Sequence, residues 1–393
     1  MTFTCIISVF RKSIIMQFSL LCAVCIMFVS CYSGKTNITG EQHQLNVSEE
    51  NIDTTYFNDH FEIAEVVPLQ TDETNLISDI KRLIRHKNQI ILLSGNTRQI
   101  FIINSKGGVI EQRIHKTGNG PGESNVILDI GFDESSEQLL VYNDYSKLLF
   151  FDLQGNFLSE TKVDDLYEEM TVVDGKVIFH NKLEGYSCYP LMIKVFNLKD
   201  KSWESFGEKD KIDFPIRNKG LQQVKSRNVW FTSPLNYSLF VFKDNQIDSL
   251  YQINVPNMSL SEDLIKKSVS NPPMFFEEVR NNNLIYSFHS IRETNNFLVL
   301  RSNQPGLFIV DKANNNVYWE KMVKENAFKF DLSSYYYPHD GDDGKIMFVF
   351  PPEIYTNYVK RLYDKRISAE QIKAIEMREE DNPVLVFYKE KDN

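Results

Sequence analysis

The stretch 138–162, "QLLVYNDYSKLLFFDLQGNFLSETK", decides the fold of this chain. It contains two short apolar runs, at 138–145 and 147–153, and then a polar turn, Gln154-Gly155-Asn156, before a further strand-like run. Glycine and asparagine adopt the positive φ that tight hairpins require. The stretch therefore predicts consecutive antiparallel strands joined by short turns.

The same pattern recurs along the chain. A first apolar strand is followed, in all but the last copy, by a second strand, a polar turn and a third strand, and another candidate strand precedes each copy. The apolar strands that open the six copies lie at 89–96, 138–145, 176–183, 228–235, 296–303 and 345–352. Units of three or four strands that recur at roughly 40–50 residues are typical of a β-propeller. We therefore predict an all-β, six-bladed β-propeller; a pair of β-sandwiches is the alternative, but it does not explain the sixfold recurrence.

The ends of the repeat region predict how the ring closes. Residues 61–71 form a candidate strand before the first unit, and 382–391 form one after the last. Pairing of these N- and C-terminal strands in the last blade would leave no open sheet edge. Two short helical insertions are expected, near 258–280, where Ser259 and Glu262 have capping-box spacing, and near 355–378.

The N-terminus has the plan of a secretory signal. Arg11 and Lys12 precede an apolar run that ends at Ser30-Cys31. We predict a lipoprotein signal peptide over 1–30, lipid attachment at Cys31, a flexible tether over 31–60 and the propeller domain over 61–393. An uncleaved anchor helix is the alternative. Both place the protein outside the cytoplasm, on a membrane, without deciding which face or whether Met1 or Met16 is the start.

Composition excludes some classes of partner. The formal net charge is −10, and removal of the leader, which has two basic residues and no acid, makes it −12. Nucleic-acid binding is therefore not expected, because it depends on clustered Lys and Arg. Only Cys188 lies beyond Cys31, so no disulfide or cysteine metal site is predicted. We expect a monomer whose stability comes from its packed core.

A glycine-rich stretch, "HKTGNGPGES" at 115–124, resembles a phosphate-binding loop at first sight. Such a loop lies between a strand and a helix, whereas a strand follows here. Glu123 occupies the third glycine position, and Pro121 lacks an N–H group. We therefore interpret Gly118, Gly120, Pro121, Gly122 and Glu123 as a structural turn that crosses from one blade to the next.

The segment "GNGPGE" (118–123) after an outer strand resembles the blade-crossing sequence of the Bacteroidota six-bladed β-propeller lipoproteins, a group with NHL-like and TolB-like members. The leader, "EVVPLQTDETNLISDI" (65–80) and "DNPVLVFYK" (381–389) are similar to that group as well. The resemblance covers most of residues 61–393. It implies the propeller fold and the cell envelope as the compartment, and says little about activity.

Polar residues on the predicted inner strands are candidates for the lining of a central channel: Arg82, Asp129, Glu169 and His289. Asp129 and Glu169 offer oxygen ligands of the kind Ca²⁺ prefers, but solvated lining is the simpler interpretation. No catalytic residues, metal ligands or cofactor are predicted.

Two functions remain open. The first is a lipid-anchored binding or scaffold module for a protein, glycan or peptide ligand. The second is a Ca²⁺-dependent enzyme of the lactonase or lyase type, with its site at the channel mouth. The sequence names neither the ligand nor the physiological process.

Overall fold

A computed structural model of the chain provides the structure, in which Asn37–Asn393 form one compact unit. It describes residues 42–53, 56–72, 75–77, 79–95, 98–114, 117–182, 193–206, 221–223, 228–232, 234–235, 237–325, 330–331, 338–341, 344–356, 377 and 380–392. Cys31, Cys188 and most of the insertion expected near 355–378 lie outside these described residues.

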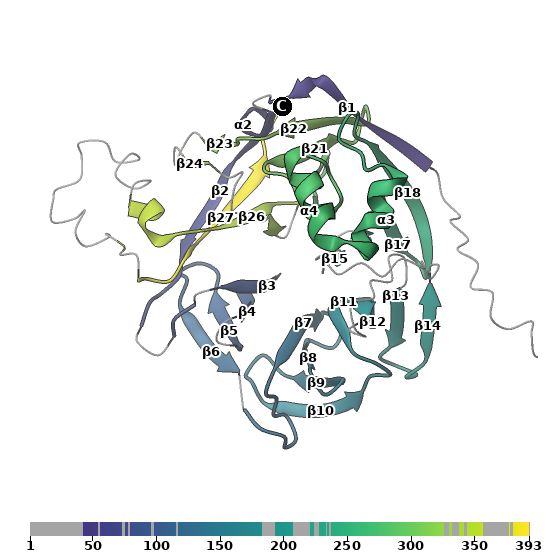
Figure 1. Cartoon of the computed structure of the whole chain (residues 1–393). Helices are drawn as coiled ribbons and strands as arrows, with labels where there is room; N and C mark the ends of the chain where they lie inside the picture. The colour runs from purple at the N-terminus through teal and green to yellow at the C-terminus, as the bar shows by residue number, and fades with distance from the viewer. Residues whose placement is uncertain are drawn as a thin grey trace, which may run out of the picture. The chain divides into compact units, whose positions relative to one another are not determined.

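The described chain is all-β, and its strands form antiparallel sheets of four in the order in which they follow one another (Figure 1). Sheets of this kind form the blades of β-propellers. The first is β3 (Ile80–His86), β4 (Gln89–Ser94), β5 (Gln99–Asn104) and β6 (Ile110–Ile114); the second is β7 (Ile127–Asp133), β8 (Gln138–Asn143), β9 (Lys147–Phe151) and β10 (Phe157–Lys162); the third is β11 (Tyr167–Val173), β12 (Lys176–Lys182), β13 (Ile193–Asn197) and β14 (Trp203–Phe206).

Two further sets of four strands share one nine-stranded sheet. They are β15 (Leu221–Gln223), β16 (Val229–Thr232), β17 (Ser238–Lys243) and β18 (Gln246–Asn254), and β19 (Phe288–Glu293), β20 (Phe297–Ser302), β21 (Leu307–Asp311) and β22 (Asn316–Glu320). The last sheet has the order β2 (Phe61–Pro68), β27 (Val384–Glu390), β26 (Ile346–Phe350), β25 (His339–Asp340). A small pair, β23 (Lys324–Glu325) and β24 (Phe330–Asp331), lies beside these sheets.

Each sheet buries apolar side chains on both faces. In β4, Ile90 and Leu92 pack with Leu385 of the last sheet, whereas Ile91 and Leu93 pack with residues of the second sheet. Successive side chains of a strand point to opposite faces, so one strand contributes to two separate cores. Every sheet therefore needs a neighbour on each side.

One edge strand of each set of four contacts the corresponding strand of the next set. We call these edge strands, β3, β7, β11, β15, β19 and β25, the first strands. β3 contacts β7, β7 contacts β11, β11 contacts β15, β15 contacts β19, β19 contacts β25, and β25 contacts β3. Polar side chains of these strands are thereby brought together from segments far apart in the sequence.

A strand that the sequence did not predict joins two of the sheets. β1 (Gln42–Ile52) pairs in parallel with β18, in the register Gln42↔Leu250, and then with β22 (Figure 1). Its Leu45 and Val47 are buried in the core between those two sheets. A short helix, α2 (Tyr56–His60), follows. β1 and α2 thus belong to the folded part, so the domain is not confined to 61–393, and the flexible tether expected over 31–60 is wrong for these two elements.

The last sheet agrees with the sequence in one respect and differs in another. β2 pairs antiparallel with β27 along its length, which is the pairing expected of 61–71 with 382–391. The strand at the other edge of this sheet is β25. The repeat pattern predicts a strand at 328–335 instead, of which the structure describes only 330–331; these two residues form β24 and pair with β23.

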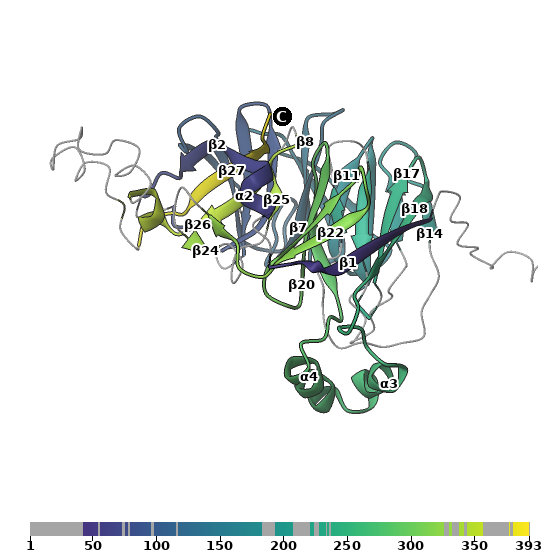
Figure 2. The same cartoon turned by 90° about the horizontal axis from the view of Figure 1, so that it is seen from above.

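The helical insertion expected near 258–280 is present. α3 (Glu262–Ser270) and α4 (Pro272–Asn281) stand clear of the sheets on one side of them (Figure 2). The N-cap of α3 is Ser261, whose side chain accepts a hydrogen bond from Leu264 N, so the expected Ser259–Glu262 capping box is wrong by two residues. Among the described residues, no helix is long and apolar enough to span a bilayer.

A buried carboxyl group holds the segment after β1 against the sheets. Glu320, at the end of β22, is 2% exposed, and its Oε2 accepts a hydrogen bond from Phe57 N of α2 at 2.8 Å. Burial, reinforced by the nearby Asp59, raises the pKa of the Glu320 carboxyl from 4.5 to about 7, although the Phe57 bond opposes the rise. The folded protein therefore binds this proton more tightly than the unfolded chain.

This shift fixes the sign of a pH effect. Because the folded state holds the extra proton, the contribution of Glu320 to stability falls as pH rises between about 4.5 and 7. We expect Glu320→Gln to be more stable than the wild type by about 1–2 kcal/mol at pH 8, with the difference vanishing towards pH 5. Denaturant unfolding at several pH values measures it. The exposed Glu50→Gln on β1 is the control, and an equal response of both variants would contradict the assignment.

Candidate functional site

The candidate residues from the sequence lie on different first strands. Arg82 is on β3, Asp129 on β7, Glu169 on β11 and His289 on β19. The structure brings Arg82 and Asp129 into direct contact: Nε donates to Oδ1 at 3.0 Å and Nη2 to Oδ2 at 2.5 Å. The side chain of Asp129 is 4% exposed and that of Arg82 is 18% exposed. This two-bond pair is the centre of the candidate site.

Two main-chain N–H groups also donate hydrogen bonds to the carboxylate of Asp129. Ile130 N donates to Oδ1 at 2.9 Å, and Met170 N of β11 donates to Oδ2 at 2.9 Å. With the two bonds from Arg82, each carboxylate oxygen accepts two hydrogen bonds, which occupies its lone pairs. A Ca²⁺ ion would have to displace these donors, so Asp129 is unsuited to the metal-ligand role considered for it.

Arg82 extends the same network across three sheets. Besides its pair with Asp129, its Nη2 donates to the carbonyl oxygen of Met170 at 2.7 Å. The guanidinium thus binds a side chain of β7 and the main chain of β11 while it is carried by β3. Arg82 and Asp129 therefore act as a structural lock at the meeting point of three first strands.

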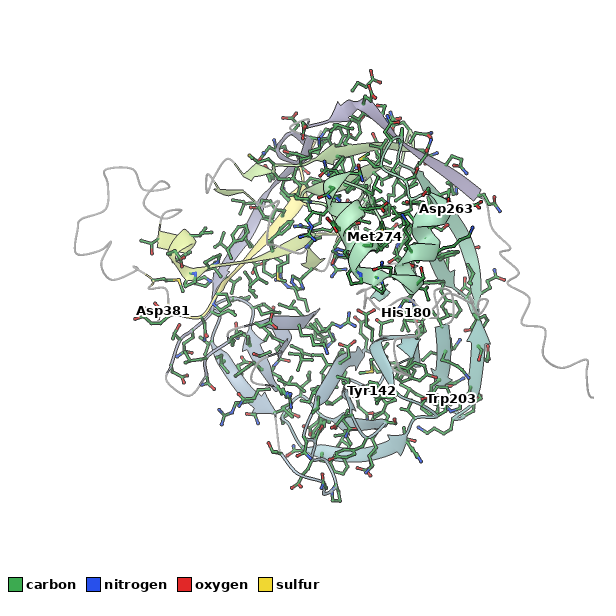
Figure 3. The ribbon with its side chains drawn as sticks, viewed as in Figure 1. Tyr142, His180, Trp203, Asp263, Met274 and Asp381 are labelled. Carbon is green, nitrogen blue, oxygen red and sulfur yellow. The ribbon has the colours of Figure 1, made fainter. Side chains whose placement is uncertain are left out.

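Glu169 has a neighbour that sequence analysis did not single out. His180 on β12 is its cross-strand partner, with Nδ1 at 3.7 Å from Glu169 Oε2 and a side chain that is 0% exposed. Figure 3 shows His180 nearer the meeting point of the first strands than Trp203, on the outer strand of the same sheet. Within the described residues, neither ring nitrogen of His180 has a hydrogen-bond partner. No pattern in the sequence marks this histidine.

His289 does not join this group. On β19 it pairs across the strand with Arg301, and its Nδ1 lies 3.1 Å from Ser290 Oγ. The described residues contain no cluster of three His, Cys, Asp or Glu side chains that could hold a metal ion. Of the four predicted lining residues, Arg82 and Asp129 thus form the lock, Glu169 lies beside His180, and His289 lies beside Ser290.

The glycine-rich turn connects β6 to β7, between outer and first strands. Glu123 folds back over it: its Oε2 accepts from Gly120 N at 2.9 Å, and Glu123 N donates to Gly120 O at 3.0 Å. Gly122 has φ +73°, and a Cβ there would lie 2.7 Å from the ring of Phe157 on β10. These contacts have the character of a rigid crossing between sheets.

An exposed polar and aromatic cluster lies beside this turn. The hydroxyl of Tyr145, in the β8–β9 turn, donates to Asn119 Oδ1 at 2.8 Å. Asn125 Nδ2 lies 2.7 Å from the same hydroxyl and 3.0 Å from Asn119 Oδ1. Tyr145 is 44% exposed. We call Asn119, Asn125 and Tyr145 the tyrosine platform. No pattern in the sequence marks this cluster, although Asn119 lies within "GNGPGE" and Asn125 follows it.

Exposed apolar residues concentrate on one face. In an antiparallel sheet of four, the turn between the second and third strands and the crossing to the next sheet lie at the same end; we call this end the crossing face. Leu76, Tyr145, Val269, Met274 and Met322 all lie in such connections. Of the other large apolar residues that the structure leaves exposed, Val109 is in a turn at the opposite end and Leu158 is on β10.

Comparison with known proteins gives one family and a set of structural relatives. A family model described as a domain of unknown function (DUF4934) matches residues 42–389. No curated protein matches the chain. A protein described as a "putative exported protein" from Bacteroides fragilis superposes with a TM-score of 0.68 at 15% identity, over 90% of this chain and all of its own. A DUF4221 family member from Bacteroides vulgatus gives 0.52 at 12% identity, over 86% of this chain and all of its own. At these identities the likeness concerns the fold.

Removal of the Asp129 charge tests the lock. Asp129→Asn leaves the partly buried Arg82 guanidinium without its anionic partner and should lower the free energy of unfolding by about 2–3 kcal/mol. Denaturant titration measures the change, with and without added Ca²⁺. Lys87→Ala, which breaks the exposed Lys87–Glu137 pair, should change little. A Ca²⁺-induced stabilisation that Asp129→Asn abolishes would show a metal site instead.

A comparison of Gly122, in the crossing turn, with Gly175, in the β11–β12 turn, distinguishes the cost of backbone strain from the cost of a steric clash. Gly122 and Gly175 both have positive φ, +73° and +69°, but a Cβ at Gly175 meets nothing within 4 Å. Gly175→Ala should cost about 1 kcal/mol of stability, and Gly122→Ala about 2–4 kcal/mol because the new methyl group meets Phe157. Thermal or chemical unfolding compares them, and equal losses would mean that the packing on Phe157 is not tight.

Proposed function

The chain belongs to the DUF4934 family, and we propose that it is a lipid-anchored binding or scaffold module of the bacterial cell envelope, built as a six-bladed β-propeller. The cycle of contacts among the first strands supports the ring, as do the cores between successive sheets and the β2–β27 pairing. The anchor rests on the sequence around Cys31, where a lipid-modified cysteine would follow the leader.

The observation that carries the binding role is the concentration of exposed apolar side chains on the crossing face. Arg82 and Asp129 on the first strands are engaged with each other and with the main chain of β11, and so connect three sheets. The connections of the crossing face are, by contrast, carried on a rigid frame, which is where binding residues gather in many folds. The ligand is a protein, a glycan or a peptide that this face contacts.

The enzyme alternative loses its main support. It required Asp129 and Glu169 to hold a divalent cation, and Asp129 already accepts a hydrogen bond at each of its four lone-pair positions. No arrangement of described side chains favours a second reaction class, so the binding role is the single proposal.

Site-specific crosslinking in cells tests the crossing face. A photoreactive amino acid at Leu76, Val269 or Met322 should give crosslinked adducts, because these exposed positions lie on the crossing face. The same residue at Val109 or Leu158, which are equally exposed but lie elsewhere, should give none. Adducts formed chiefly from Val109 or Leu158 would place the binding surface elsewhere and contradict the proposal.

A further inference from the structure

The tyrosine platform differs from the rest of the surface in chemistry. The chain contains 28 Phe and 18 Tyr, yet Tyr145 is the one aromatic residue among the large apolar side chains that the described surface leaves exposed. The others are aliphatic side chains and methionines. An aromatic ring that packing does not require, surrounded by amides, needs a separate explanation.

The platform is held in a fixed conformation by the turn that carries Tyr145. Asn143, which is 0% exposed, accepts hydrogen bonds at its Oδ1 from Tyr145 N and Lys147 N, both at 3.1 Å. Asp144 N donates to Val126 O at 3.2 Å and so joins this turn to the crossing turn. Tyr145 is thus fixed by its backbone and not only through its hydroxyl.

The amides are positioned from the other side by the glycine-rich segment. Asn119 lies between Gly118 and Gly120, the residues over which Glu123 folds. Asn125 follows the same turn, and its main-chain oxygen accepts a hydrogen bond from Arg98 Nη1 at 3.3 Å. Arg98 belongs to the β4–β5 turn of the preceding sheet. Three connections of the crossing face therefore converge on one small area.

We propose that the tyrosine platform is a carbohydrate-binding subsite, which rests on the proposed binding function and names its ligand class. The C–H faces of a pyranose ring are apolar and pack on an aromatic ring, as other apolar groups do. The hydrogen bonds within the platform use Asn119 Oδ1 and Asn125 Nδ2. They leave Asn119 Nδ2 as a donor and Asn125 Oδ1 as an acceptor, which match adjacent hydroxyl groups of a sugar. The platform offers both features within hydrogen-bond distance of each other.

The charges and size of the platform favour a neutral glycan over a peptide. Its three side chains have no formal charge, and the guanidinium of Arg98 is already directed to the chain itself. Peptide grooves generally offer a sheet edge or several apolar pockets, whereas here one ring lies among amides. A single sugar would contact a small area and bind with a dissociation constant on the order of 1 mM, and a longer glycan would bind more tightly.

Glycan binding by the purified mature chain tests this subsite. Ligand-observed NMR against a panel of neutral mono- and oligosaccharides identifies a binder, and titration gives its affinity. Tyr145→Ala should weaken binding about tenfold or more, because it removes the stacking surface. Tyr145→Phe keeps the ring and should lose only about two- to threefold, and Asn119→Ala should lie between them. Leu158→Ala, which removes an equally exposed apolar side chain on β10, should bind as the wild type does.

The outcomes separate this inference from the wider proposal. If no neutral glycan binds at about 10 mM, or if Tyr145→Ala binds as tightly as Leu158→Ala, the carbohydrate subsite is wrong. If crosslinks still form at Leu76 and Met322 in that case, the crossing face remains a binding surface for another ligand. If Tyr145→Ala weakens the binding of peptides and leaves the binding of glycans unchanged, the platform binds peptides, and the inference is overturned.

Discussion

Burial of both faces of every sheet is the constraint on which the rest of the structure depends. β20 has no exposed residue: Leu298 and Leu300 pack into one core and Phe297 and Val299 into another. A sheet with two apolar faces cannot end at water without exposing a whole layer of aliphatic side chains. Each sheet therefore packs between two others, and a cyclic arrangement satisfies all of them at once. The strands that come first in each sheet then meet one another, which brings Arg82, Asp129 and the main chain of Met170 together.

The polar centre and the apolar cores impose opposite demands on the same strands. Where first strands converge, polar side chains lose much of their water, and each must find partners in the protein. Asp129 meets that demand with hydrogen bonds from its own strand, from β3 and from β11. These hydrogen bonds fix the Asp129 carboxylate and occupy both of its oxygen atoms. Under the proposed function, binding is left to exposed residues of the connections, such as Leu76 and Met322.

The sequence predicted what depends on local pattern and missed what depends on distant partners. The recurring strands and the α3–α4 insertion follow from short-range apolar periodicity and turn residues, so they could be predicted. β1 could not, because it has few apolar residues, and its partners β18 and β22 lie more than 200 residues further along the chain. The strand pattern marks Asp129 as a polar residue of an inner strand, but its hydrogen bonds depend on Arg82 and Met170, which lie far from it in the sequence. The exposure of Tyr145 was not predicted, because the residue stands at the end of the apolar run 138–145 and was interpreted as part of that strand.

The position of the tyrosine platform follows from the way the frame is built. The crossing turn must pass from an outer strand to the next first strand, and its glycines permit the close approach to Phe157 that fixes its path. A turn fixed in this way can present Asn119 and Asn125 without any contribution from the cores or from the Arg82–Asp129 lock. Substitutions of Asn119, Asn125 or Tyr145 therefore alter the surface without disturbing the apolar cores between the sheets. A fold that satisfies its own constraints internally is free to vary its ligand at such connections, and the rigid turns of the crossing face provide the required precision.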